Sequence, residues 1–122
     1  MKIISLSSLQ TEIITLFNSS NCSSYHLSEG QGTSHTYYMN FQQDSLIGPH
    51  VAGFDQLFLV ISGSGWVAGK DDCPQEISAG QVAYFKKGER HSKGSEAGMM
   101  VMMLQFELLN LNSDLHKLFN AF

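Results

Sequence analysis

An all-β fold, either a sandwich or a barrel, is the architecture that this sequence of 122 residues predicts. Turn-forming residues recur at short intervals, and the runs between them are short and rich in aromatic and β-branched residues. No helical pattern separates these runs, and strands spaced in this way are typical of all-β sandwiches and barrels. Because the chain is long enough to bury one real core, we expect a single domain over residues 1–122.

The expected strands follow one another between the turns. They are assigned to 2–6, 24–27, 36–42, 45–51 (bent or broken at Gly48-Pro49), 56–61, 66–68, 75–77, 81–85 and 99–106. Segment 8–17 is ambiguous, because its apolar residues fit a short helix while Ile13-Ile14-Thr15 also suits a strand.

The C-terminal segment predicts one amphipathic helix over about 108–122. Its apolar residues recur at helical spacing, and Asn112 or Ser113 could cap the final turns. The recurring residues are Leu108, Leu111, Leu115, Leu118, Phe119 and Phe122. The barrel itself is then expected over about 24–107.

The strands at 56–61 and 99–106 are apolar on both faces, whereas a half-solvated strand alternates apolar with polar residues. One face must look inward, and something must cover the other, because exposed apolar area costs roughly 25 cal/mol per Å². The helix at 108–122 or a second copy of the chain could provide that cover. From these two strands we expect a homodimer.

Composition excludes several function classes. A formal net charge of −4 with scattered basic residues does not predict the basic surface that a nucleic-acid-binding protein needs. No apolar run approaches the about 20 residues of a membrane helix, and the N-terminus lacks the features of a signal peptide. Cys22 and Cys73 are too few for a disulfide framework and lack C-x-x-C spacing, so free thiols are favoured. We expect a soluble cytoplasmic protein.

Residues 44–63 resemble the first motif of the cupin superfamily, G-x5-H-x-H-x(3,4)-E-x6-G. The H, second H, E and final G places of that motif hold His50, Ala52, Gln56 and Gly63 in this sequence. The place of the opening glycine holds Asp44.

Residues 80–95 resemble the second cupin motif, G-x5-P-x-G-x2-H-x3-N. The stretch "GQVAYFKKGERH" supplies Gly80, Gly88 and His91, while Lys86 replaces the proline and Ser95 the final Asn. The resemblance implies a small single-domain cupin of the RmlC-like type, a jelly-roll barrel in the form of a double-stranded β-helix, with degenerate metal-binding motifs.

The resemblance also implies a site. In metal-binding cupins the two His of H-x-H, the Glu and the second-motif His hold one divalent ion, which leaves His50, Gln56 and His91 as candidate ligands here. Glu89, two residues before His91, could supply a substitute carboxylate, although a solvated turn residue beside Lys87 and Arg90 is the favoured interpretation. Zn, Ni, Mn or Fe would suit such donors, but a 2-His-1-Gln set offsets none of the ion's charge, so affinity should fall.

The same implied site needs apolar walls around its polar groups, as small-molecule pockets generally have. The expected lining residues are Phe58, Trp66, Tyr84, Met100 and Met102, with Phe106 also expected in the interior. Methionines suit an irregular wall and hint at an apolar or aromatic ligand. His26, His35 and His116 have no matched partner and are interpreted as surface or hydrogen-bonding residues.

Three functions stay open at this point. The first is a cupin barrel that binds a small molecule in its interior, with at most a weakly held divalent metal. The second is a metal-dependent isomerase, lyase or dioxygenase that uses His50, Gln56 and His91. The third is a dimerising barrel with a vestigial pocket. The altered ligand set favours the first over the second, and whether the protein is an enzyme is undecided.

Overall fold

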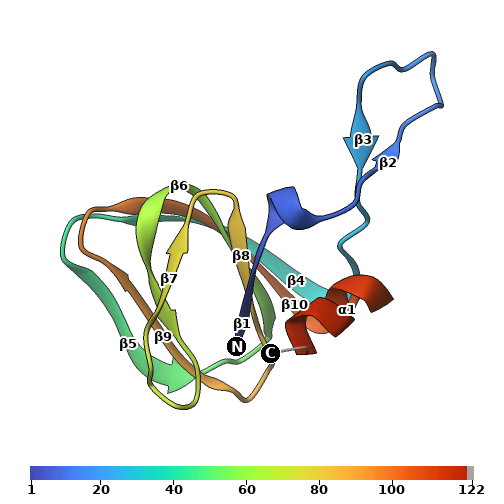
Figure 1. The fold of residues 1–122 in the computed structure, drawn as a ribbon. Coiled ribbons are helices and arrows are strands. Elements are labelled where there is room, and N and C mark those ends of the chain that lie inside the picture. The colour runs from blue at the N-terminus through green and yellow to red at the C-terminus, as the bar shows by residue number, and fades with distance from the viewer. Residues whose placement is uncertain (121–122) are drawn as a thin grey trace.

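The fold of this chain, a computed structural model that describes residues 1–120, is a β-barrel with a short C-terminal helix (Figure 1). The prediction of an all-β architecture is therefore confirmed. The elements in chain order are β1 Lys2–Ser5, η1 Leu6–Ser8 (a 3-10 helix), β2 Glu12–Ile13, β3 Ser23–Ser24, β4 Ser28–Phe41, β5 Ser45–Val51, β6 Asp55–Ala68, β7 Gln75–Ser78, β8 Gln81–Phe85, β9 Arg90–Ser95, β10 Met99–Leu111 and α1 Ser113–Asn120.

Strand β6 connects the two sides of the barrel. Its first half pairs with β8 and β10 in the order β1-β8-β6-β10-β4, and its second half pairs with β7 and β9, which in turn pairs with β5. The sequence predicted two strands here with a Gly-Ser-Gly turn between them. Gly63 instead bends a continuous strand: its φ is 79°, and a Cβ at this position would meet the carbonyl oxygen of Gly98.

The barrel interior is filled by an inner core. It consists of alternate residues from the facing strands, since successive side chains of a strand point to opposite faces. Its buried members are Phe41, Phe58, Val60, Val67, Ile77, Ala83, Phe85, Met99, Val101 and Met103. Ladder pairs such as Met103 with Phe58 and Phe58 with Ala83 place these side chains on the same inward face.

A separate outer core lies on the other face of the same sheet. Its buried members are Ile4, Leu57, Val82, Tyr84, Leu109 and Leu115, with Leu104 and Phe106 partly buried against them. Leu115 comes from α1 and is 1% exposed, so the helix covers this end of the sheet. The helix begins at Ser113, where the Asn112 side chain accepts a hydrogen bond from the Asp114 backbone N–H at 3.0 Å. Residues 108–111, predicted as helix, instead extend β10, and residues 121–122 lie outside the described residues.

The segment between β1 and β4 forms an arm that projects away from the barrel (Figure 1). The arm contains the two-stranded sheet of β2 and β3, in which Glu12 pairs with Ser24 and Ile13 with Ser23. This resolves the ambiguous segment 8–17 into a 3-10 turn followed by a short strand and a bend. Ile13, Leu16 and Phe17 at its tip are 77%, 66% and 92% exposed.

Strand β9 has no counterpart in the sequence prediction, which placed turns at 87–88 and 94–98 and no strand between them. Its sequence, Arg90–Ser95, contains no β-branched or aromatic residue, yet all but its first residue is buried. This strand pairs with β5 and β6, and its buried Ser95 hydroxyl donates a hydrogen bond to the Ser64 carbonyl oxygen of β6. Within the described residues, no helix is both long and apolar enough to cross a membrane.

Candidate functional site

Strands β5 and β9 bring together the two histidines that the sequence singled out. His50 and His91 are partners in the antiparallel ladder, and their ring centroids lie 4.4 Å apart. His91 is 1% exposed, whereas His50 is exposed at the end of β5. The His50 ring therefore lies at the surface, against a buried imidazole.

Gln56 enters the same region from the beginning of β6. It pairs with Phe85 of β8, and the Phe85 ring contacts the His91 ring at 4.7 Å between centroids. Gln56 is 3% exposed, and its Oε1 has no hydrogen-bond partner. Ala52, at the place of the second motif histidine, is buried and offers no donor atom.

A fourth polar residue, Lys93, was missed by the sequence analysis. Its Nζ lies 3.0 Å from Nδ1 of His91 and sits over the rings of Phe58 and Phe85, 5.2 Å and 4.9 Å from their centroids. Lys93 is 2% exposed. Its position two residues after His91 would have placed it on the same face, had β9 been recognised as a strand. We call His50, Gln56, His91 and Lys93 the polar cluster.

Burial sets the charges within the polar cluster. Burial, with smaller contributions from Lys93 and His50, lowers the pKa of His91 from 6.5 to about 3. Burial also lowers the pKa of Lys93 from 10.5 to about 8. At neutral pH the imidazole is therefore uncharged and the amine is mostly an ammonium. The ammonium donates to Nδ1, so the imidazole proton is on Nε2.

Two buried polar atoms of the cluster lack partners among the described residues. They are Nε2 of His91, which is a donor in this tautomer, and Oε1 of Gln56, which is an acceptor. Leaving such groups unpaired typically costs about 1–3 kcal/mol each. Buried polar groups are nearly always satisfied in native proteins, so this pair calls for a partner from outside the chain, either an ordered water or a ligand.

The cluster does not fit the divalent ion that the cupin resemblance implies. A metal on Nε2 of His91 would need the lone pair that the proton occupies, and the neighbouring ammonium would repel it. Gln56 brings no charge, and the Glu89 carboxylate is held 2.6 Å from the Met1 amino group. Across residues 1–120, no group of three or more His, Cys, Asp or Glu side chains is arranged to hold a metal.

The inward face of β4 adds aromatic groups beside this region. In the ladder, β10 places Gln105 between Gln56 of β6 and His35 of β4. The His35 ring stacks on Tyr37, at 6.0 Å between centroids, and meets the edge of Phe54 at 5.3 Å. No partner for His35 was predicted from the sequence, because the pairing of β4 with β10 is not visible in the local pattern.

Of the five expected lining residues, the structure places Phe58 in the inner core and the other four elsewhere. Tyr84 lies in the outer core, as does Phe106. Met100 and Met102 belong to the same outward row of β10, and Met100 is 39% exposed. The expectation that they line the interior was wrong because the apolar strands gave no sign of which face looks inward.

Trp66 also lies on the outside, where it covers Gly94. It lines a hollow of about 610 Å³ together with Glu76 and Glu96. His50, Gln56 and His91 do not line this hollow. Gln56, His91 and Lys93 are almost completely buried, so the polar cluster is a packed site.

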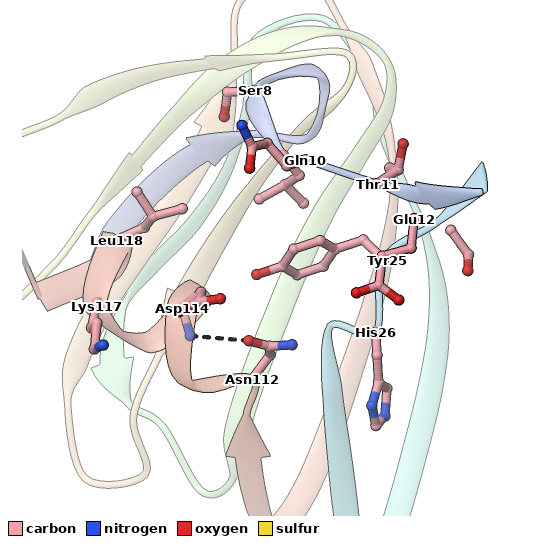
Figure 2. Close-up of a pocket in the computed structure, with 12 residues that line it drawn as sticks. Ser8, Gln10, Thr11, Glu12, Tyr25, His26, Asn112, Asp114, Lys117 and Leu118 are labelled. Carbon is pink, nitrogen blue, oxygen red and sulfur yellow. Dashed lines mark hydrogen bonds between the residues drawn. The ribbon is translucent and has the colours of Figure 1, made fainter.

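A hollow of about 750 Å³ lies between the arm and α1 (Figure 2). Figure 2 shows Tyr25 reaching across it from the arm toward the side of the helix that carries Asp114 and Lys117. The Tyr25 hydroxyl is buried without a hydrogen-bond partner in the described structure. His26 lines the same hollow, so this histidine is far from the polar cluster in the fold and belongs to the arm.

Comparisons with solved structures show which known fold this chain shares. No protein-family model matches the chain, and no curated protein matches it. Among solved structures, a cupin superfamily protein from Desulfitobacterium hafniense aligns with a TM-score of 0.56 and 13% identity over 80% of this chain and 93% of its own. A cupin-like protein from Thermotoga maritima aligns with a TM-score of 0.57 and 12% identity over 69% and 71%.

Another similar structure is the DMSP lyase DddQ from Ruegeria pomeroyi, with a TM-score of 0.56 and 12% identity over 60% of this chain. This chain spans only 38% of that lyase, and 68% of a Streptococcus pyogenes protein of unknown function with a TM-score of 0.58. Identities this low establish architecture and leave activity open. The barrel, its strand order and these neighbours together identify the chain as a small protein of the cupin fold.

Proposed function

We propose that this protein binds a small molecule at the polar cluster without a metal ion. The observation that carries the proposal is the pair of buried, unpartnered atoms, Nε2 of His91 and Oε1 of Gln56. A ligand that accepts a hydrogen bond from the first and donates one to the second would remove both penalties. Access to the pair is from the His50 side, because His50 is the exposed member of the cluster.

The flanking groups fit the same proposal. His35, Tyr37 and Phe54 offer flat aromatic surface at the edge of the cluster, and aromatic walls around a few polar groups are usual in small-molecule sites. Since the inner core is filled, the ligand is bound at the barrel mouth and not deep inside. Binding then requires the His50 ring to move from its contact with His91.

Elemental analysis and thermal stability test this proposal. Protein purified without chelator is analysed for Zn, Ni, Mn and Fe, and a panel of small polar metabolites is then screened for a rise in Tm. We expect no stoichiometric metal and at least one compound that stabilises the wild type but not Gln56→Leu, which removes the unpartnered Oε1, with His116→Ala as the control on the exposed face of α1. A binder present at 100 times its Kd adds about 2.7 kcal/mol.

The outcomes separate the competing functions. Stoichiometric metal that is lost in His50→Ala would overturn the proposal in favour of a metal-dependent isomerase, lyase or dioxygenase. An absence of both metal and stabilising compound would favour a barrel whose role is association.

Homodimerisation, the role of the barrel in association, is supported by a separate observation. The outward row of β4, β6 and β10 leaves Tyr38, Ile61 and Met100 57%, 47% and 39% exposed. Strand β4 pairs with β10 alone among the described strands, and residues 30–41 contain no Asp, Glu, Lys, Arg or Pro. Edge strands are usually protected by such residues, so a long unprotected edge favours cover by a second copy. Light scattering after size exclusion tests this, with Met100→Glu expected to shift a dimer to monomer.

A further inference from the structure

We infer that Lys93 converts His91 from a metal ligand into a hydrogen-bond donor, so that the polar cluster takes a ligand carbonyl oxygen in place of a divalent ion. This inference rests on the proposed metal-free binding function and names the chemical group that the site recognises. It is carried by the contact between Lys93 Nζ and His91 Nδ1, at 3.0 Å.

The two histidines differ in what their Nδ1 atoms contact. A histidine that holds a metal through Nε2 normally donates its Nδ1–H to a carbonyl or carboxylate, which fixes the required tautomer. His50 has that arrangement, since its Nδ1 lies 2.8 Å from the Gly48 carbonyl oxygen. His91 has the opposite one, because the group facing its Nδ1 is an amine that donates. Only one of the two imidazoles therefore has Nε2 free to coordinate.

Lys93 is fixed in this position by its surroundings. It shares the inward face of β9 with His91, and its ladder partners are Ile47 of β5 and Val67 of β6. The aromatic faces of Phe58 and Phe85 stabilise the ammonium through cation–π contacts. Among the described residues, no carboxylate forms an ion pair with Lys93; the Glu89 carboxylate pairs with the Met1 amino group, and Asp72 pairs with Arg90. A divalent ion would meet this uncompensated charge.

The same contact makes His91 a stronger donor. An ammonium that donates to Nδ1 draws electron density from the ring, and a polarised Nε2–H then forms a stronger hydrogen bond with an oxygen acceptor. Its natural acceptor is a carbonyl oxygen, and Gln56 Oε1 is placed in the same region to accept from an N–H of the same ligand. A carboxamide carries both groups side by side. The structure thus assigns a neutral carbonyl compound, and an amide in particular, to this site.

The tautomer of His91 is tested directly by nitrogen-15 NMR of the full chain. We expect the wild type to show the Nε2–H form, and Lys93→Met to lose it in favour of the Nδ1–H form or a mixture. Lys70→Met removes an exposed lysine elsewhere and should change nothing. An Nδ1–H form in the wild type would overturn the inference, and this result does not depend on whether any variant folds.

Cobalt(II) binding separates this inference from the proposed function. We expect Gln56→Glu combined with Lys93→Met to bind cobalt at least about tenfold more tightly than the wild type, as changes next to metal-bound histidines typically do. Tight binding to the wild type would overturn both proposals. A double variant that melts cooperatively but binds no better than the wild type would overturn the role of Lys93 alone.

Acetamide is the probe for the ligand class, with methylammonium as its counterpart. We expect acetamide to shift the His91 Nε2 resonance in a saturable way, and methylammonium, which presents only donors, to leave it unchanged. An equal response to both probes, or to neither, would overturn the assignment of a carbonyl ligand while leaving the tautomer result intact.

Discussion

The two cores of this barrel are built from neighbouring residues but have different compositions. Leu57 belongs to the outer core and Phe58 to the inner core, although they are consecutive in β6. The outer core is formed by aliphatic and aromatic side chains under the helix and the N-terminal segment. The inner core instead packs against His91 and Lys93, both almost completely buried. Among the described residues, the buried histidine and the buried lysine therefore both lie on the inward face of the barrel.

This difference indicates how the fold separates the apolar packing that stabilises it from the proposed binding site. Burying a polar group without a full set of partners destabilises the folded state, whereas burying an apolar core of the same size stabilises it. A chain that keeps an ammonium and an unpaired imidazole inside its barrel needs a second apolar core to offset that cost. The outer core closed by Leu115 provides it. Substitutions on the two faces of β6 should therefore have separable effects.

The largest loss of unfolding free energy is expected from Phe58→Ala, and Leu57→Ala is its matched comparison on the other face of β6. Each removes a buried side chain, and the expected losses of unfolding free energy are about 3–5 kcal/mol for Phe58 and about 2–5 kcal/mol for Leu57. Only Phe58→Ala also removes an aromatic face under Lys93. Urea denaturation measures the stability, and the nitrogen-15 signals of His91 measure the site. Equal changes in the His91 signals of both variants would contradict the separation of the two cores.

A smaller loss of unfolding free energy is expected when the pH is lowered, because the folded protein disfavours protonation of His91. The pKa of this residue is lowered by its burial and by the charges of Lys93 and His50, to about 3 against 6.5 in the unfolded chain. Between these values the unfolded chain binds a proton that the folded chain does not, so stability falls as pH decreases from 6.5, by up to about 1.4 kcal/mol per unit. Above pH 6.5 the contribution is complete and constant.

The measurement is urea denaturation at intervals from pH 7 to pH 4. His91→Gln should remove most of the decline that is due to this residue, whereas His116→Gln, on the exposed surface of α1, should preserve it. Identical pH profiles for His91→Gln and the wild type would show that residue 91 takes up its proton without disturbing the barrel.

The sequence predicted the parts of the fold that depend on local pattern. Strands 45–51 and 81–85 match β5 and β8, and the glycines at 63, 80 and 88 all have positive φ, as motif glycines should. Asp44 at the opening glycine's place also has a positive φ, of 56°, which Asp tolerates better than most residues. This explains how the first motif keeps its turn without the glycine.

The parts that the sequence missed depend on tertiary contacts. Strand β9 is polar because its side chains meet other polar groups inside the barrel, and no propensity scale predicts a strand from His-Ser-Lys-Gly-Ser. Lys93 was therefore not predicted as a site residue, although its Nζ lies 3.0 Å from Nδ1 of His91. The inward face of a strand that is apolar on both sides, such as β10, is likewise fixed only by its partners, which is why Met100 and Met102 were assigned to the wrong face.

The smallest effect is expected at the entrance to the helix that closes the outer core. The Asn112 side chain accepts a hydrogen bond from the Asp114 N–H, so Asn112→Ala should lower the unfolding free energy by about 1 kcal/mol. Asn110→Ala, two residues earlier at an exposed position of β10, should cost less than half as much. The His91 tautomer should be unchanged in both, because the helix contacts the outer core and the polar cluster lies on the opposite face of the sheet. A change in that tautomer on loss of the cap would mean that the two cores respond as one unit.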